Sequence, residues 1–137
     1  MLRTTVLTFV LATVAAFGQP TLAQSVAADG LLRDPAGRAL YVFDRDHPWG
    51  ASNCYEGCAE TWPAFVARIG AEVKGELSVH ARTDGQMQWG WNGKPLYTFA
   101  GDQAPGDAEG DGLGGVWHAV RVSPQAPPSM HAGAAPR

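Results

Sequence analysis

Apolar side chains alternate along several short stretches of the chain, and this alternation predicts β-strands. Tyr41 and Phe43 alternate with Leu40 and Val42, and the same arrangement returns 56 positions later. Because successive side chains of a strand point to opposite faces, Tyr41 and Phe43 are expected to share one face and Leu40 to lie on the other.

Turn sequences precede both of these stretches. Residues 34–37 read Asp-Pro-Ala-Gly, and Asn92-Gly93 is a strong signal for a two-residue β-hairpin turn. Each stretch is therefore predicted to be the returning strand of a hairpin. The predicted strands are 30–33, 38–43, 77–82, 86–91 and 94–99, with further short strands that begin at Trp62 and Trp117, and short helical turns are suggested at 56–61 and 63–68.

One phrase, G-[RK]-x-L-Y-x-F-x-x-D, occurs at residues 37–46 and again at 93–102. A fixed offset of this size indicates a duplicated structural unit. Two units, about 30–67 and 86–122, are each expected to contain a hairpin, a long loop and a Trp-led strand. The predicted fold class is mainly β, with two pseudo-repeats of antiparallel hairpins forming a small sandwich or distorted barrel with long loops. The repeated positions are Leu40, Tyr41, Phe43, Asp46, Leu96, Tyr97, Phe99 and Asp102.

The beginning of the chain differs from the rest. A positively charged start is followed by an apolar run, 4–17, that is too short to span a bilayer, and small residues follow it. This pattern predicts a secretory signal peptide over 1–23, cleaved near Ala23. The protein is therefore expected to be periplasmic or secreted, with no membrane span.

The other end of the chain, 123–137, holds four prolines and few large apolar side chains, which predicts a disordered tail. One β-rich domain, 24–122, is left between the two ends. Loss of Arg3 with the signal peptide leaves nine basic and 13 acidic side chains, a net charge of −4. This balance, without a basic patch, argues against nucleic acid as a partner.

Cys54 and Cys58 lie in the first long loop, 44–61. Since exported proteins meet oxidising conditions, a local disulfide is the favoured interpretation, and it would contribute about 2 kcal/mol on the chain-entropy model. The C-x3-C spacing differs from the C-x-x-C of redox proteins, but a redox protein that uses this pair is an alternative function. A thiolate metal site would need further ligands, for which His47 is the nearby candidate.

The second long loop, 101–114, carries alternating carboxylates. Asp107, Glu109 and Asp111 precede a glycine, as in the first half of a calcium-binding D-x-[DN]-x-[DN]-G loop. The position at which such a loop has its bidentate Glu holds His118. The stretch is therefore either a solvated acidic turn or a calcium site, and no other cofactor is suggested by this loop.

A transition metal is a second possibility for a metal site, with His47, His118 and the loop carboxylates as ligands. A metal-binding periplasmic protein is therefore a further alternative function. Asp46 and Asp102 are expected to have a local role, in which each carboxylate accepts backbone N–H groups of the loop that follows it.

Trp49 lies in the first long loop beside His47, and the second loop has no matching tryptophan. An exposed Trp49 would suggest stacking on a sugar ring or on a partner surface, and otherwise it would cover the end of the sheet. Trp62 and Trp117 are matched between the repeats and are expected in the core. No nucleophile elbow or glycine-rich phosphate loop is found, so an enzyme is not predicted.

Four motifs, taken in order, resemble the bacterial secreted repeat family whose members are often called predicted lipoproteins with a Y-x-[FWY]-x-x-D motif. The motifs are L-Y-x-F-x-x-D at 40–46, N-C-Y-x-x-C-A-x-x-W-P at 53–63, G-K-P-L-Y-x-F-x-x-D at 93–102 and G-D-G-x-G-G-x-W-H at 110–118. The resemblance implies export, duplication and a compact domain, but no activity. A cysteine for acylation is missing at the cleavage point, so membrane anchoring is not implied.

These observations predict an exported, non-enzymatic β-rich module. It is expected to bind a small ligand or a cell-envelope partner through the two repeat-equivalent loops, 44–61 and 101–114.

Overall fold

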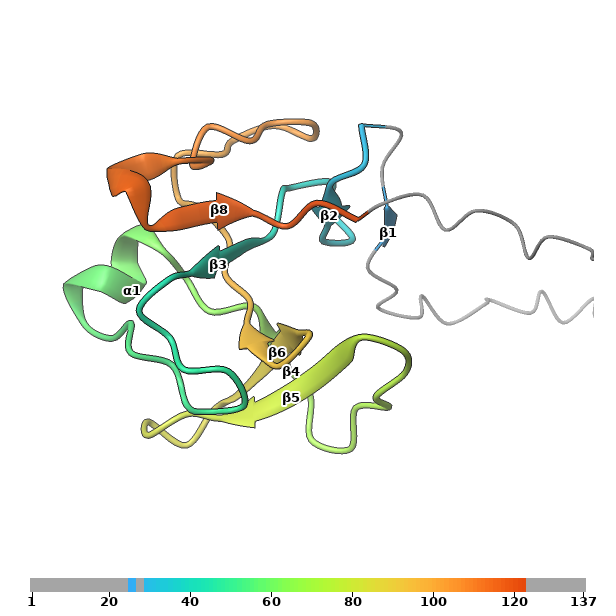
Figure 1. Cartoon of the computed structure of the whole chain (residues 1–137), viewed down its shortest axis with the longest axis vertical. Coiled ribbons are helices and arrows are strands. Elements are labelled where there is room, and N and C mark those ends of the chain that lie inside the picture. Colours follow the sequence, from blue (N-terminus) through green and yellow to red (C-terminus); the bar gives the residue numbers. More distant parts are fainter. Residues whose placement is uncertain (1–24, 27–28, 123–137) are drawn as a thin grey trace, which may run out of the picture.

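The computed structural model describes residues 25–26 and 29–122 (Figure 1), and the expected signal peptide and C-terminal tail lie outside these residues. The described chain is mainly β, as predicted. Its elements are β1 (Ser25–Val26), β2 (Leu32–Arg33), β3 (Tyr41–Phe43), α1 (Gly57–Thr61), β4 (Val66–Ala67), β5 (Leu77–Ala81), β6 (Met87–Trp91), β7 (Lys94–Pro95), the 3-10 helix η1 (Leu113–Gly115) and β8 (Trp117–Ala119).

All strand pairs are antiparallel. β1 pairs with β2, β3 pairs with β8, and β6 lies between β4 and β5 and also pairs with β7. The sheets stay open at their edges, so the strands do not close into a barrel and the distorted-barrel form of the prediction is not adopted.

Both predicted hairpin turns are formed. In the first, the Gly37 N–H donates to the Asp34 carbonyl at 2.9 Å. In the second, Asn92 and Gly93 have φ values of 48° and 77°, and a type I′ turn requires positive φ at both central residues. The strand that precedes each hairpin pairs with it, β1 with β2 and β5 with β6. Each repeat therefore includes this strand, and the first repeat runs from β1 to β4 and the second from β5 to β8.

The last strand of each repeat pairs with the other repeat. β8 of the second repeat lies beside β3 of the first (Figure 1), with His118 opposite Val42. β4 of the first repeat likewise pairs with β6 of the second. At the centre, Tyr41 and Tyr97 exchange both of their backbone hydrogen bonds, at 2.8 and 2.9 Å. The two repeats are therefore interlocked.

The central strands have a hydrophobic cluster on each face, as the alternation predicts. Tyr41 and Phe43 lie in the first cluster, whereas Leu40 lies in the second. The first cluster comprises Leu31, Ala39, Tyr41, Phe43, Cys54, Trp62, Tyr97, Trp117 and Ala119, and the second comprises Leu32, Leu40, Ala67, Trp89, Leu96 and Val120.

One of the two suggested helical turns is wrong. Gly57–Thr61 is helical, but residues 63–68 contain β4 instead. The Phe65 N–H donates to the Leu96 carbonyl at 2.9 Å, and the Phe65 carbonyl accepts the Trp89 N–H at 2.8 Å. Because the second repeat supplies partners on both sides, this segment is extended.

Candidate functional site

The tyrosine and the aspartate of each repeated phrase are bonded to the opposite repeat. The Tyr41 hydroxyl donates to Asp102 Oδ2 at 2.6 Å, and the Tyr97 hydroxyl donates to Asp46 Oδ2 at 2.6 Å. All four side chains are buried. These crossed pairs tie the two repeats together, which is a role that the sequence did not predict.

The second oxygen of each aspartate holds the long loop that follows it. Asp46 Oδ1 accepts the Asn53 N–H, and Asp102 Oδ1 accepts the Glu109 N–H, both at 2.8 Å. The two bonds occupy matching positions in the two repeats. Each carboxylate therefore joins one loop to the centre of the fold.

Burial shifts the pKa values of these groups. Desolvation raises the pKa of Asp46, while hydrogen bonds from Tyr97 and Asn53 oppose the rise. Desolvation also raises the pKa of Tyr41 and of Tyr97 above the ordinary 10.0, and the hydrogen bond of each hydroxyl to its aspartate adds to the rise. Both tyrosines are therefore held in the neutral, donating form.

We expect Tyr41 and Tyr97 to stay protonated above pH 10 for as long as the protein is folded. Since an unfolded tyrosine ionises near pH 10, the stability that these groups contribute is complete below that pH and is lost as the pH rises. Tyrosinate absorbance and near-ultraviolet circular dichroism, followed during alkaline titration, test this. The expectation would be contradicted if all three tyrosines ionised near pH 10 while the circular dichroism stayed native. In the Tyr97→Phe protein, the rise in tyrosinate absorbance above pH 10 should be smaller.

Four aromatic rings stack across the contact between the repeats. The rings of Trp62 and Trp117 are 3.9 Å apart between centroids and within 4° of parallel. Phe43 stacks on Trp117 at 4.2 Å, and Phe99 packs on Trp62 at 4.6 Å. Trp62 and Trp117 are buried, as predicted. Each half of this stack is the repeat equivalent of the other half.

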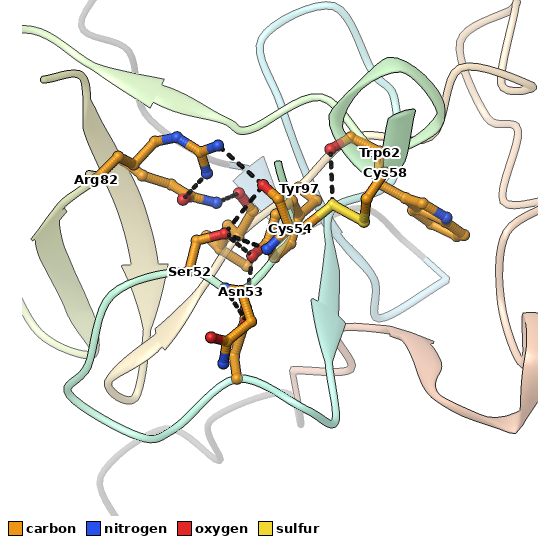
Figure 2. Close-up of a disulfide and its surroundings, with 10 residues drawn as sticks. Ser52, Asn53, Cys54, Cys58, Trp62, Arg82 and Tyr97 are labelled. Carbon is orange, nitrogen blue, oxygen red and sulfur yellow. Dashed lines mark hydrogen bonds between the residues drawn. A yellow bond between two sulfur atoms is a disulfide. The ribbon is translucent and has the colours of Figure 1, made fainter. Parts of the chain in front are cut away.

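Cys54 and Cys58 form a disulfide at the start of α1 (Figure 2), with an S–S distance of 2.02 Å. Both cysteines of the chain are therefore in the favoured local bond. The positions 56 residues later hold Gly110 and Gly114. A disulfide thus supports the first loop only, and glycines stand at the matching positions of the second.

The first loop is also held by buried polar side chains from the second repeat. Arg82 Nη2 donates to the Cys54 carbonyl at 2.9 Å (Figure 2), and Arg82 Nη1 donates to Gln88 Oε1 at 2.8 Å. Gln88 Nε2 in turn donates to the Leu96 carbonyl at 2.7 Å. Sequence reasoning missed this chain of bonds, because polar residues in a strand are ordinarily expected to face solvent.

The tips of the two long loops cover the hairpin turns of the opposite repeats. The Trp49 N–H donates to the Gly93 carbonyl at 2.7 Å, and a Cβ on Gly93 would lie 2.5 Å from the indole. Pro105, 56 positions after Trp49, lies against Gly37 in the same way. Since proline has no N–H, the next residue, Gly106, donates to the Gly37 carbonyl at 3.1 Å.

Trp49 differs from its counterpart in being a large and exposed side chain. Its exposed fraction is 74% although the ring also covers Gly93. Its φ of 64° lies in the left-handed region, which bulky residues rarely adopt and which costs on the order of 1–3 kcal/mol. The neighbouring Gly50 N–H donates to the His47 carbonyl at 3.0 Å, which closes the turn around Trp49.

His80 supports this loop from the interior. The side chain is buried, with Nδ1 at 2.9 Å from the Gly50 carbonyl oxygen and Nε2 at 2.8 Å from Ser78 Oγ. Both ring nitrogens therefore have partners. No local sequence pattern indicates this contact, because it joins residues thirty positions apart.

The carboxylates of the second loop point to separate partners. Asp107 Oδ2 accepts the N–H groups of Gln103 and the next residue, at 2.9 and 2.8 Å. Asp111 pairs with Arg121 at 2.7 Å, and Glu109 is exposed. Asp107 therefore closes a turn of the second loop through its own hydrogen bonds.

The two candidate histidine ligands do not share the hydrogen-bond partners of these carboxylates. His118 Nε2 is 2.8 Å from Asp44 Oδ2 at the surface, and His47 is exposed in the first loop. Within residues 25–26 and 29–122, no group of three His, Cys, Asp or Glu side chains is arranged to hold a metal ion.

The segments 25–66 and 78–121 match a family model described as a secreted repeat of unknown function, and the chain belongs to this family. The two matched segments coincide with the two interlocked repeats. Neither the curated proteins nor the solved structures contain a match to the chain. In the part of the chain that the structure describes, no helix has the length and apolar character needed to cross a membrane.

Proposed function

We propose that the protein is an exported, non-enzymatic module that binds a ligand or a cell-envelope partner through the tip of its first long loop, with Trp49 as the main contact. The observation that carries this proposal is the exposed indole, held in a left-handed backbone conformation at a position where the second repeat has Pro105.

The comparison between the two loop tips supports this role. Both tips cover a glycine turn, and the small ring of Pro105 is sufficient to do so. The indole of Trp49 is therefore larger than the fold needs, and its backbone conformation costs free energy. An exposed tryptophan with a fixed backbone offers a large contact area at a small loss of side-chain entropy, which is why this residue type is enriched among the residues that dominate binding.

The non-enzymatic part of the proposal is supported by the contacts of the reactive side chains. Ser52 Oγ lies 2.6 Å from the Tyr97 hydroxyl, His80 is bonded on both ring nitrogens, and Cys54 is in the disulfide. All three side chains are also buried, so none of them is presented to a substrate at the surface.

Trp49→Ala is expected to weaken binding to a washed cell-envelope fraction at least about thirtyfold, since a central tryptophan contact is worth about 2 kcal/mol or more. Co-sedimentation of the purified protein over a concentration series measures this. The matched controls are Pro105→Ala, at the equivalent tip, and Ile69→Ala, at a residue that is 97% exposed. Both should bind as the unmodified chain does.

Two results would overturn the proposal. One is equal co-sedimentation of Trp49→Ala and the unmodified chain. The other, for an envelope partner, is an unmodified chain that does not sediment with the envelope fraction. Unchanged thermal unfolding of the Trp49→Ala protein is required in either case, and is expected because the side chain is exposed.

A further inference from the structure

We propose that two copies of this chain can exchange their repeats, so that the first repeat of one copy folds with the second repeat of the other. This inference rests on the interlocked strands and not on the proposed function. In the exchanged dimer, Trp49 of one copy would lie on Gly93 of the other, so both copies would contribute to each loop-tip surface.

The contacts that hold the fold together join the repeats to one another. β3 pairs with β8 and β4 pairs with β6, while Trp62 stacks on Trp117 and Tyr41 bonds to Asp102. Each of these contacts needs one first repeat and one second repeat. The same contacts form whether the two repeats belong to one chain or to two, which is the condition for exchange.

The linker between the repeats, residues 68–76, has the character of a hinge. Its side chains are exposed apart from the half-buried Ala71. The Ala71 N–H donates to the Arg68 carbonyl at 3.0 Å, and the Lys74 carbonyl accepts the Leu77 N–H at 3.1 Å, so these two bonds are local turns. The Glu76 carbonyl accepts the Asn92 N–H at 2.7 Å, which is a bond within the second repeat and is kept on exchange. Straightening the linker therefore exposes little apolar surface.

The linker must cross β6 to close the fold within one chain. β4 ends at Ala67, which lies opposite Met87 at the first residue of β6. β5 begins at Leu77, which lies opposite Trp91 at the last residue of β6 and on its other side. The linker therefore has to run the length of β6 and pass from one side of it to the other. Four residues along a strand and two strand spacings across give a span of about 17 Å. The present linker reaches about 33 Å when extended, so it closes within one chain with slack.

Deletion of residues 69–75 tests the proposal. The two linker residues that remain reach about 10 Å, which is too short to cross β6 within one chain. We expect the shortened protein to have twice the monomer mass by light scattering and a native near-ultraviolet spectrum. The control replaces 69–75 by a Gly/Ser segment of equal length and should match the mass of the unmodified chain. A natively folded monomer of the shortened chain would overturn the proposal.

A second measurement decides the matter where the shortened chain does not fold. The unmodified protein is refolded from denaturant at a high and at a low concentration, then analysed at one common concentration. We expect a natively folded dimer after refolding at high concentration, which persists on dilution and returns to monomer only after renewed unfolding. Monomer alone from both refolding reactions would overturn the proposal.

Discussion

Replacing Trp62 by alanine is expected to lower the free energy of unfolding by about 3–5 kcal/mol. The side chain is buried between the ring of Trp117 on one side and Phe99 on the other, and Tyr41 packs edge-on against it at 5.3 Å. Its loss opens a cavity at the place where the two repeats meet. Because a domain of this size has only about 5–15 kcal/mol of stability, the midpoint of urea unfolding should fall markedly.

Trp49→Ala is the matched control for this substitution, since it removes the same side chain from an exposed position. We expect it to change the free energy of unfolding by less than about 1 kcal/mol. A Trp62→Ala protein as stable as the Trp49→Ala protein would show that the ring stack does not hold the repeats together.

Asp102→Ala is expected to lower the free energy of unfolding by about 2–4 kcal/mol, because it leaves one buried and one partly buried donor without their acceptor. The Tyr41 hydroxyl donates to Asp102 Oδ2, and the Glu109 N–H donates to Asp102 Oδ1. Chemical unfolding at neutral pH measures the loss. The control is Asp44→Ala, because Asp44 is half-exposed and pairs at the surface with His118. Surface pairs contribute about 1 kcal/mol or less.

If Asp102→Ala costs no more than Asp44→Ala, the buried carboxylate is not a link between the repeats. The corresponding substitution in the first phrase, Asp46→Ala, provides a check within the same molecule. It removes the acceptor of the Tyr97 hydroxyl and of the Asn53 N–H, so the two losses should be of similar size.

The sequence predicted most of the local structure, because its signals act over a few residues. Asn92 and Gly93 determine one hairpin turn by their tolerance of positive φ, and the alternation of Tyr41 with Leu40 determines which side chain enters which cluster. Local signals gave two predictions for 63–68, a helical turn and a short strand that begins at Trp62. The strand is the one that forms, because its partners come from the other repeat, far away in the chain.

The crossed pairing could not be predicted in the same way. Tyr41 is five residues from Asp46 and 61 from Asp102, and both aspartates end the same phrase. Local reasoning has no means of choosing between two identical acceptors, since the choice depends on how the repeats pack. The difference between the two loop tips could be predicted in part, because the offset of 56 matches Trp49 with Pro105. The exposure of the Trp49 side chain could not, because it depends on tertiary structure.

The interlocking of the repeats through the crossed tyrosine–aspartate pairs is tested most directly by double-mutant cycles. We expect a coupling free energy of about 1–3 kcal/mol between Tyr41→Phe and Asp102→Ala, which lie in different repeats. Between Tyr41→Phe and Asp46→Ala, which lie in the same phrase and share no hydrogen bond, we expect additivity within about 0.5 kcal/mol. Coupling within the same phrase, with additivity between the repeats, would show that the crossed pairs do not join the repeats.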